Sequence, residues 1–113
     1  MERKKIKVYT NLDKVEKSYN IMAIKNNDVI KYIDLENNIM IIDMANDVIK
    51  RENQDYIFNI DFKNSMITIK VKKFNKTFDK SIKVLIIDKN NRSYLVRYIL
   101  TSEEIVNEYY IEF

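Results

Sequence analysis

The chain has 113 residues and a net charge of +3, and it contains no glycine, proline, histidine, cysteine or tryptophan. Without imidazole or thiol groups it cannot form a Ser-His-Asp or Cys-His nucleophile system or the usual zinc sites, and without glycine it has no phosphate-binding loop, dinucleotide fingerprint or standard calcium loop. Its wealth of Ile, Lys and Asn is typical of an AT-rich coding genome, so the small basic excess is weak evidence for a nucleic-acid partner.

Apolar residues recur with a period of two along most of the chain, which predicts strands with one buried face. Pairs of asparagines separate several of these runs, at Asn26-Asn27, Asn37-Asn38 and Asn90-Asn91. Asparagine is the residue other than glycine that best tolerates the left-handed backbone of a tight turn. The expected strands are Lys5–Thr10, Ser18–Lys25, Val29–Leu35, Ile39–Met44, Asp47–Arg51, Asp55–Phe62, Met66–Lys72, Ser81–Ile87, Ser93–Leu100 and Ile105–Phe113.

The clearest strand pair lies in the middle of the chain. Aromatic and apolar residues occupy every second position from Tyr56 to Phe62, and apolar residues do so again from Ile67 to Val71. The short polar segment Lys63–Ser65 separates the two runs. This arrangement predicts an antiparallel hairpin.

Two segments also fit a helical turn. One is Leu12–Lys17, and the other is Ser102–Tyr110, where Thr101 and Glu104 have the spacing of a capping box. The apolar residues of the second segment mostly follow the period of a strand, so we expect it to be the closing strand of a sheet. A meander of eight to ten short strands forms either a closed barrel or two packed sheets. We favour the barrel, because an open sheet leaves unpaired edges and the chain has no proline to protect them.

The acidic residues form no convincing catalytic pair or metal site. Glu103 and Glu104 are neighbours in the sequence, and neighbours on a strand point to opposite faces, so they form no pair. The other groups considered are Glu104, Glu108 and Glu112, which share one solvated face, and the pairs Asp43 with Asp47 and Asp88 with Asn90, which have too few ligands for calcium. We assign no catalytic residue, no metal ligand and no cofactor.

The densest basic segment spans residues 70–80. Its lysines flank two aromatic residues, Phe74 and Phe78, and stacking aromatics among lysines are how sheet surfaces hold single-stranded nucleic acid. The same aromatics also suit the end of a barrel as a cap. The lysines are Lys70, Lys72, Lys73, Lys76 and Lys80.

Arginine is rarer than lysine, and away from the N-terminus it occurs only at Arg51, Arg92 and Arg97. Arg97 lies between Leu95 and Ile99 on one face of an expected strand whose other face carries tyrosines. If the tyrosine face points inward, Leu95, Arg97 and Ile99 form an outer patch for a protein partner. If the reverse holds, Arg97 points into the interior, where a buried guanidinium needs an anion or a carboxylate.

The order of several segments resembles a known family. The run Asp47–Glu52, the aromatic strand Tyr56–Phe62 with its hairpin partner, and the late segments Tyr98–Leu100 and Tyr110–Phe113 resemble the small bacterial proteins of domain-of-unknown-function family 1934, the YwiB-like proteins. The similarity extends from about Val29 onward. The resemblance implies a calycin-like eight-stranded β-barrel, related in shape to lipocalins, and it carries over no catalytic residues.

We therefore predict an all-β fold of one domain, residues 1–113, in which a single antiparallel meander closes into a small calycin- or lipocalin-like barrel of about eight strands. Such a barrel is either filled by side chains or just wide enough for one small molecule. The first function we expect is binding of a small apolar or amphipathic ligand, whose contact residues the sequence does not assign. The alternatives are a solid barrel that binds a protein partner, and weak nucleic-acid binding through residues 70–80.

Enzymatic activity is not expected, because the Asp, Glu, Lys, Tyr, Ser and Thr residues do not cluster in any catalytic pattern. The basic N-terminus is followed by no apolar stretch, so we expect no secretory signal. No later run approaches the ~18 apolar residues of a membrane helix, and we expect no membrane partner. The absence of cysteine suits a reducing compartment, so the expected location is cytoplasmic.

Overall fold

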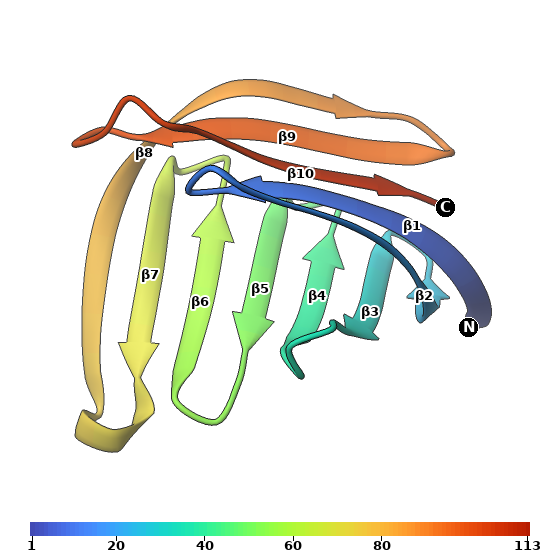
Figure 1. Ribbon diagram of the computed structural model, residues 1–113, viewed down its shortest axis with the longest axis horizontal. Coiled ribbons are helices and arrows are strands. Elements are labelled where there is room, and N and C mark those ends of the chain that lie inside the picture. Colours follow the sequence, from blue (N-terminus) through green and yellow to red (C-terminus); the bar gives the residue numbers. More distant parts are fainter.

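Ten antiparallel strands, each hydrogen-bonded to its neighbours in the chain, form a barrel that the pairing of β1 with β10 closes (Figure 1). This computed structural model describes all residues, 1–113. The one helix is η1 (Lys72–Phe74), a single 3-10 turn. The strands are β1 (Glu2–Leu12), β2 (Val15–Asn26), β3 (Val29–Ile33), β4 (Ile39–Asp43), β5 (Val48–Glu52), β6 (Tyr56–Asp61), β7 (Met66–Val71), β8 (Lys76–Lys89), β9 (Ser93–Leu100) and β10 (Val106–Glu112).

The all-β class and the closed antiparallel barrel are confirmed, but the expected number of about eight strands is wrong. Each of the ten expected ranges corresponds to a separate strand, because every connection is short enough to turn the chain straight back. The uncertain C-terminal segment is β10, the closing strand, and no helix forms there. The largest error in length is β8, which begins at Lys76 rather than Ser81. A ten-stranded barrel is wider than an eight-stranded one, so its interior is harder to fill.

The turns of this glycine-free chain are made largely by asparagine and aspartate. Asn27 and Asn37 have φ angles of 54° and 63°, which confirms the left-handed geometry expected at these two pairs. At the third pair the expectation is wrong, because neither Asn90 nor Asn91 is left-handed. There the Asn90 side chain holds the turn instead, by accepting hydrogen bonds from the backbone N–H groups of Arg92 and Ser93 at 2.8 and 3.0 Å.

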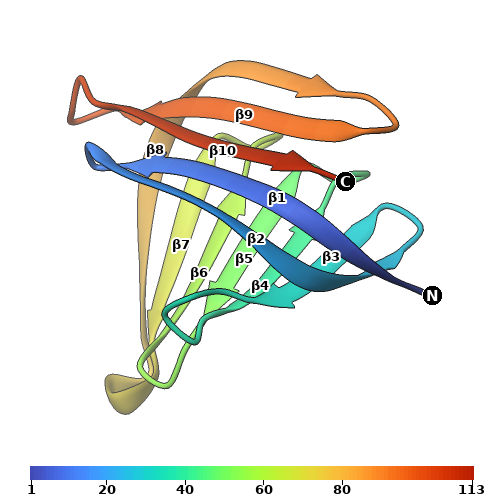
Figure 2. The same ribbon diagram turned by 45° about the vertical axis from the view of Figure 1, so that its right-hand side comes forward.

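The barrel is flattened into two layers whose strands cross. Residues 76–81 of β8 pair with β7, and residues 82–89 pair with β9, so β8 passes from one layer to the other. The first layer contains β3 to β7, and the second contains β9, β10, β1 and β2 (Figures 1 and 2). A register shift between Val84 and Ile86 lies in the second half of β8. Such irregularities let a strand bend at the corner of a barrel.

The second corner, between β2 and β3, is only partly closed. β2 pairs with β1 along its whole length, from Lys25 opposite Glu2 to Val15 opposite Leu12. In contrast, β2 pairs with β3 only at residues 24–26. Residues 15–23 therefore have no strand partner on that side, and the two layers separate there. We call this the splayed end of the barrel.

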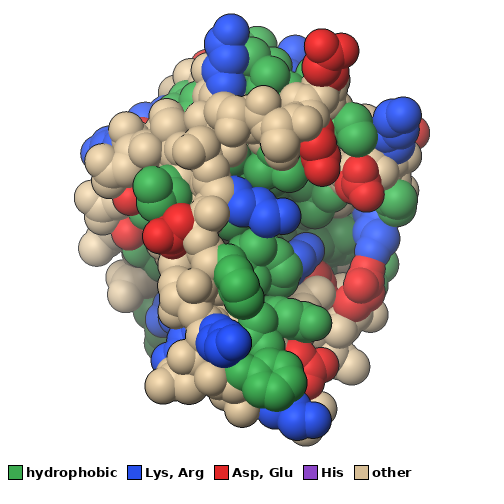
Figure 3. Space-filling model, turned by 90° about the vertical axis from the view of Figure 1, so that its left-hand side faces the viewer, with side chains coloured by type: hydrophobic (Ala, Val, Ile, Leu, Met, Phe, Trp, Pro, Cys, Tyr) green, Lys and Arg blue, Asp and Glu red, His purple; other side chains and the backbone are tan.

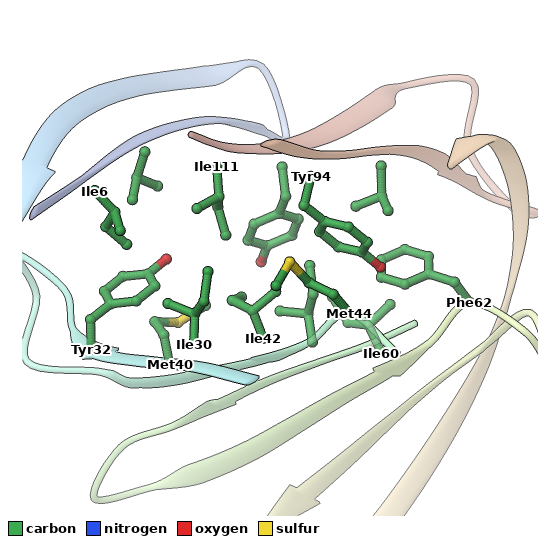
Figure 4. Close-up of a cluster of buried hydrophobic side chains, with 14 of the residues drawn as sticks. Ile6, Ile30, Tyr32, Met40, Ile42, Met44, Ile60, Phe62, Tyr94 and Ile111 are labelled. Atoms are coloured by element: carbon green, nitrogen blue, oxygen red, sulfur yellow. The ribbon is translucent and has the colours of Figure 1, made fainter. Parts of the chain in front are cut away.

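Hydrophobic side chains from both layers fill the interior, from Tyr32 near the splayed end to Phe62 at the opposite end (Figure 4). Asp47 closes that opposite end with a buried polar contact, because its Oδ1 accepts hydrogen bonds from the Tyr94 hydroxyl at 3.0 Å and from Lys89 Nζ at 3.1 Å. Lys89 Nζ also donates to the Met44 carbonyl at 2.9 Å. We call this the packed end. Its fully buried side chains include Ile6, Val8, Ile30, Ile42, Ile49, Tyr94, Val96 and Ile111.

Candidate ligand-binding site

Two cavities lie side by side in the splayed end. The larger has a volume of about 230 Å³ and lies between β2 and the connection from β3 to β4. The smaller has a volume of about 180 Å³ and extends toward β7, β8 and β9. Leu12, Arg51 and Tyr109 line both, so the cavities meet at these three residues. The face that carries η1 and the first half of β8 is hollowed, with hydrophobic side chains gathered in the hollow (Figure 3).

Arg51 is the central polar residue of this site. It stands opposite Met40 on β4 and Phe58 on β6, and it follows the buried Ile49 by two positions, so its side chain points inward. Its guanidinium carbon lies 4.3 Å from the centre of the Phe58 ring, in a cation–π contact. The Nε atom is buried and has no hydrogen-bond partner. None of the ion pairs of the protein includes Arg51.

Buried tyrosines surround the guanidinium. Tyr32 is only 5% exposed, its hydroxyl has no hydrogen-bond partner, and its side chain reaches from β3 into the interior (Figure 4). Burial raises the pKa of Tyr32, and the neighbouring Tyr19 raises it further. Burial also raises the pKa of Tyr109 to about 12, against the opposing effect of the Arg51 charge. These hydroxyls therefore stay neutral at physiological pH and remain able to donate hydrogen bonds.

Tyr98 lines the smaller cavity and is buried as well. Burial raises the pKa of Tyr98, the neighbouring Tyr109 raises it further, and the Arg51 charge acts in the opposite direction. Arg51, Tyr98 and Tyr109 all line the smaller cavity. The ring of Tyr98 also packs edge to face against Phe62, with 5.6 Å between centroids. This contact fixes the ring between the cavity and the packed end.

The mouth of the larger cavity carries charged residues that already have partners. The Asp34 carboxylate accepts hydrogen bonds from the backbone N–H groups of Glu36 and Asn38, both at 2.9 Å, and from Asn38 Nδ2 at 3.0 Å. Lys17 on β2 forms an ion pair with Glu36 across the mouth. The acidic groups near the mouth are thus engaged locally, and neither is paired with Arg51.

The structure places Arg97, the arginine singled out by sequence, on the outside of the barrel. Tyr94, Val96 and Tyr98 point inward, so the outward placement of Leu95, Arg97 and Ile99 is confirmed and the interior alternative is wrong for Arg97. A protein partner for this patch stays a prediction. Arg97 Nε donates to Glu108 on the adjacent strand β10. Glu108 is partly covered by this pair, whereas Glu104 and Glu112 are exposed as expected.

No group of acidic residues is arranged to hold a metal ion. Asp43 instead stabilises its own turn, because its two carboxylate oxygens accept from the backbone N–H and the side-chain amide of Asn46 at 3.2 and 2.9 Å. Asp47 belongs to the buried contact at the packed end. The two aspartates paired in the sequence therefore have separate structural partners.

The basic segment 70–80 spans the end of β7, η1 and the start of β8. Phe74 and Phe78 are exposed, at 65% and 52%. Part of the charge is compensated, because Lys72 Nζ lies 2.7 Å from Glu52 Oε2. Asp79 lies in the same segment and accepts a hydrogen bond from Thr68. Glu52 and Asp79 therefore compensate part of the positive charge of this segment.

The sequence contains a signal for the inward position of Arg51. The expected strand 47–51 ends at this residue, and the period of two places Arg51 on the same face as Ile49. The strand is short, however, and Arg97 lies in a longer alternating run.

No protein-family model, curated protein or solved structure matches the chain. The resemblance to family 1934 and the calycin relationship therefore stay predictions. In addition, no helix of the structure is long and apolar enough to cross a membrane.

Proposed function

We propose that this protein binds a small amphipathic molecule in the splayed end of its barrel and does no chemistry on it. The observation that carries the proposal is the meeting of two cavities at Arg51, inside a barrel whose other end is packed. Ligand sites are typically concave, mostly apolar and supplied with a few converging polar groups. The splayed end combines these properties.

The size and lining of the cavities support an apolar ligand body. A cavity of ~150 Å³ is enough for benzene, and the larger cavity here has about 230 Å³. Leu12, Leu35 and Met40 contribute to its wall, and Phe58 and Ile69 to that of the smaller cavity. The gap along residues 15–23 of β2 offers a route of entry, because no strand covers that side.

We propose binding rather than catalysis because the polar groups of the site include no pair of side chains that could act as nucleophile and base. The tyrosines remain protonated, and Asp34 is occupied by three hydrogen bonds. We also propose that the barrel is calycin-like and that the protein works in the cytoplasm.

The ligand site is tested by blocking it. Leu12→Trp places a large side chain where the two cavities meet, and we expect it to abolish binding of 1-octanol measured by isothermal titration calorimetry. Leu85→Trp is the matched control, because Leu85 is 43% exposed on the barrel exterior. Native mass spectrometry of the purified protein, compared with its denatured mass, reports any ligand carried from the cell. Equal octanol binding by both variants would contradict the proposed site.

A second candidate function, binding of a protein partner, is favoured by an apolar patch on the exterior of β8, β9 and β10. Leu85, Ile86 and Val106 are 43%, 39% and 46% exposed, and Ile99 stands opposite Val106. Exposed apolar patches of this kind often mark interaction sites. Val106→Lys should abolish any self-association seen by analytical ultracentrifugation, whereas a monomer at all concentrations would remove self-association as the role of this patch.

A further inference from the structure

The interior of the barrel contains two ionic side chains whose situations differ. At the packed end, Asp47 is neutralised by Lys89 at 3.1 Å and bonded to the Tyr94 hydroxyl at 3.0 Å. At the splayed end, Arg51 has no counter-ion. A buried charge is normally paired, because removing it from water costs free energy that only a partner recovers. Arg51 is half-buried, its Nε atom is fully buried, and no carboxylate of the protein compensates its charge.

Unused hydrogen-bond donors accompany this charge. Arg51 Nε and the Tyr32 hydroxyl are both buried, and neither lies within hydrogen-bond distance of a protein partner, although the neighbouring Tyr19 is close enough to raise the pKa of Tyr32. The hydroxyls of Tyr98 and Tyr109 line the cavities without being among these buried, unpartnered atoms. Buried polar groups are hydrogen-bonded in the great majority of cases, and exceptions that gather in one cavity point to a ligand that accepts these bonds. Every one of these groups can donate, and the guanidinium can do nothing else.

We propose that the ligand is a monocarboxylate with an apolar tail, whose carboxylate pairs with Arg51 and accepts a hydrogen bond from Tyr32. This inference rests on the proposed function, because it assigns the head group of the molecule that the two cavities hold. The tail lies against the apolar walls formed by residues such as Leu12, Met40 and Phe58. The stacking of Arg51 on Phe58 keeps the planar face of the guanidinium covered and leaves its edge free for a two-pronged contact.

The charges around the site favour a single negative charge over two. Arg51 is the one cation that lines both cavities. Asp34 and Glu36 line the larger cavity, and Asp13 and Lys80 line the smaller one. A phosphate dianion would bring an excess negative charge next to these carboxylates. A carboxylate balances Arg51 one to one, and its planar geometry matches the fork of the guanidinium.

The inference is tested with octanoate and 1-octanol, two probes that share a tail and differ in the head group. Isothermal titration calorimetry at neutral pH gives their affinities for wild type, Arg51→Met and Arg97→Met. Arg97 is the matched control, because it is an arginine with an ion pair on the barrel exterior. We expect Arg51→Met to weaken octanoate binding about 10- to 100-fold. Octanol binding should change less than about threefold, and Arg97→Met should resemble wild type for both probes.

Two further variants keep the test decisive. Arg51→Lys retains the charge without the fork, and Tyr32→Phe removes one hydroxyl, so each should cause a smaller loss of octanoate affinity than Arg51→Met. Circular dichroism of each variant establishes that it folds. The carboxylate inference is overturned if octanol binds and octanoate binds no more tightly. It is also overturned if Arg51→Met and Arg51→Lys leave the affinity for octanoate unchanged. In both cases the proposed function stands. If neither probe binds wild type, the inference and the proposed function are both overturned.

Discussion

Replacing Arg51 by methionine is expected to make the ligand-free protein more stable. The guanidinium is held in the barrel with Nε buried and unpaired and with no carboxylate beside it. A buried polar group without a partner costs about 1–3 kcal/mol. Methionine removes the charge and the unpaired donor, and its flexible thioether follows the path of the arginine stem between the β4 and β6 neighbours.

The opposing contribution is the contact with Phe58. A cation–π interaction at 4.3 Å contributes about 0.5–2 kcal/mol, depending on how far the pair is removed from water. A methionine sulfur against the same ring restores about 0.3–1.5 kcal/mol of this loss. The net gain is therefore about 1 kcal/mol. For a chain of this length that corresponds to a rise in the melting temperature of about 4 °C.

The assay is urea denaturation of ligand-free protein, followed by circular dichroism, with Arg97→Met as the control. Arg97 is bound to Glu108 on the outside of the barrel, so its loss should reduce the free energy of unfolding by about 0–1 kcal/mol. The two arginine substitutions are thus expected to have opposite signs. A loss of more than about 1 kcal/mol in Arg51→Met would refute the reasoning, because it would mean that the guanidinium is already satisfied within the protein.

Three further predictions concern the rest of the barrel. Tyr94→Phe removes the buried hydrogen bond to Asp47 and should cost about 1–2 kcal/mol in urea denaturation, whereas Tyr110→Phe, which removes an exposed bond to Glu112, should cost less than about 0.5 kcal/mol. Asn27→Ala forces alanine into a left-handed turn and should destabilise by about 1–2 kcal/mol, whereas Asn91→Ala, outside that region, should be nearly neutral. Because the folded-state pKa of Tyr109 is raised to about 12, the folded state retains a proton that the unfolded chain loses near pH ~10, so stability should fall as pH rises above ~10. Tyr109→Phe should reduce that fall, as measured by urea denaturation across this range, and an equal fall in both proteins would contradict the assignment.

Most of the fold follows from local pattern. Alternating residues such as those from Tyr56 to Phe62 determine one buried face, and the register of the central hairpin follows from its short turn. The asparagine pairs at residues 26–27 and 37–38 predict two further turns correctly, because asparagine tolerates left-handed geometry. The sequence pattern does not predict the start of β8, because the first half of this strand, from Lys76, is mostly exposed and has no apolar alternation.

The strand number and the splayed corner depend on long-range geometry that no local pattern records. Tyr19, Ile21 and Ala23 of β2 follow the alternation of a fully paired strand, yet β3 has only five residues and cannot follow β2 along its length. The cavity arises from this difference in length. For the same reason the role of Arg51 was not predictable in detail, because the sequence shows which face it shares with Ile49 but not that this face meets an incompletely closed corner.

The two ends of the barrel differ in the partners that they provide for an ionic side chain, and this difference concerns the role of Arg51. Two positions before it, Ile49 is fully buried and fills the same face of β5 with an apolar side chain. Another apolar residue between Met40 and Phe58 would extend that packing and remove an unpaired charge, so stability alone does not account for an arginine at this position. The packed end shows that the fold accommodates a buried ionic group when it provides the partners, as it does for Asp47. The protein provides no such partner for the half-buried Arg51, and this contrast is the reason for proposing a carboxylate ligand there, with the gap beside β2 as its route of entry.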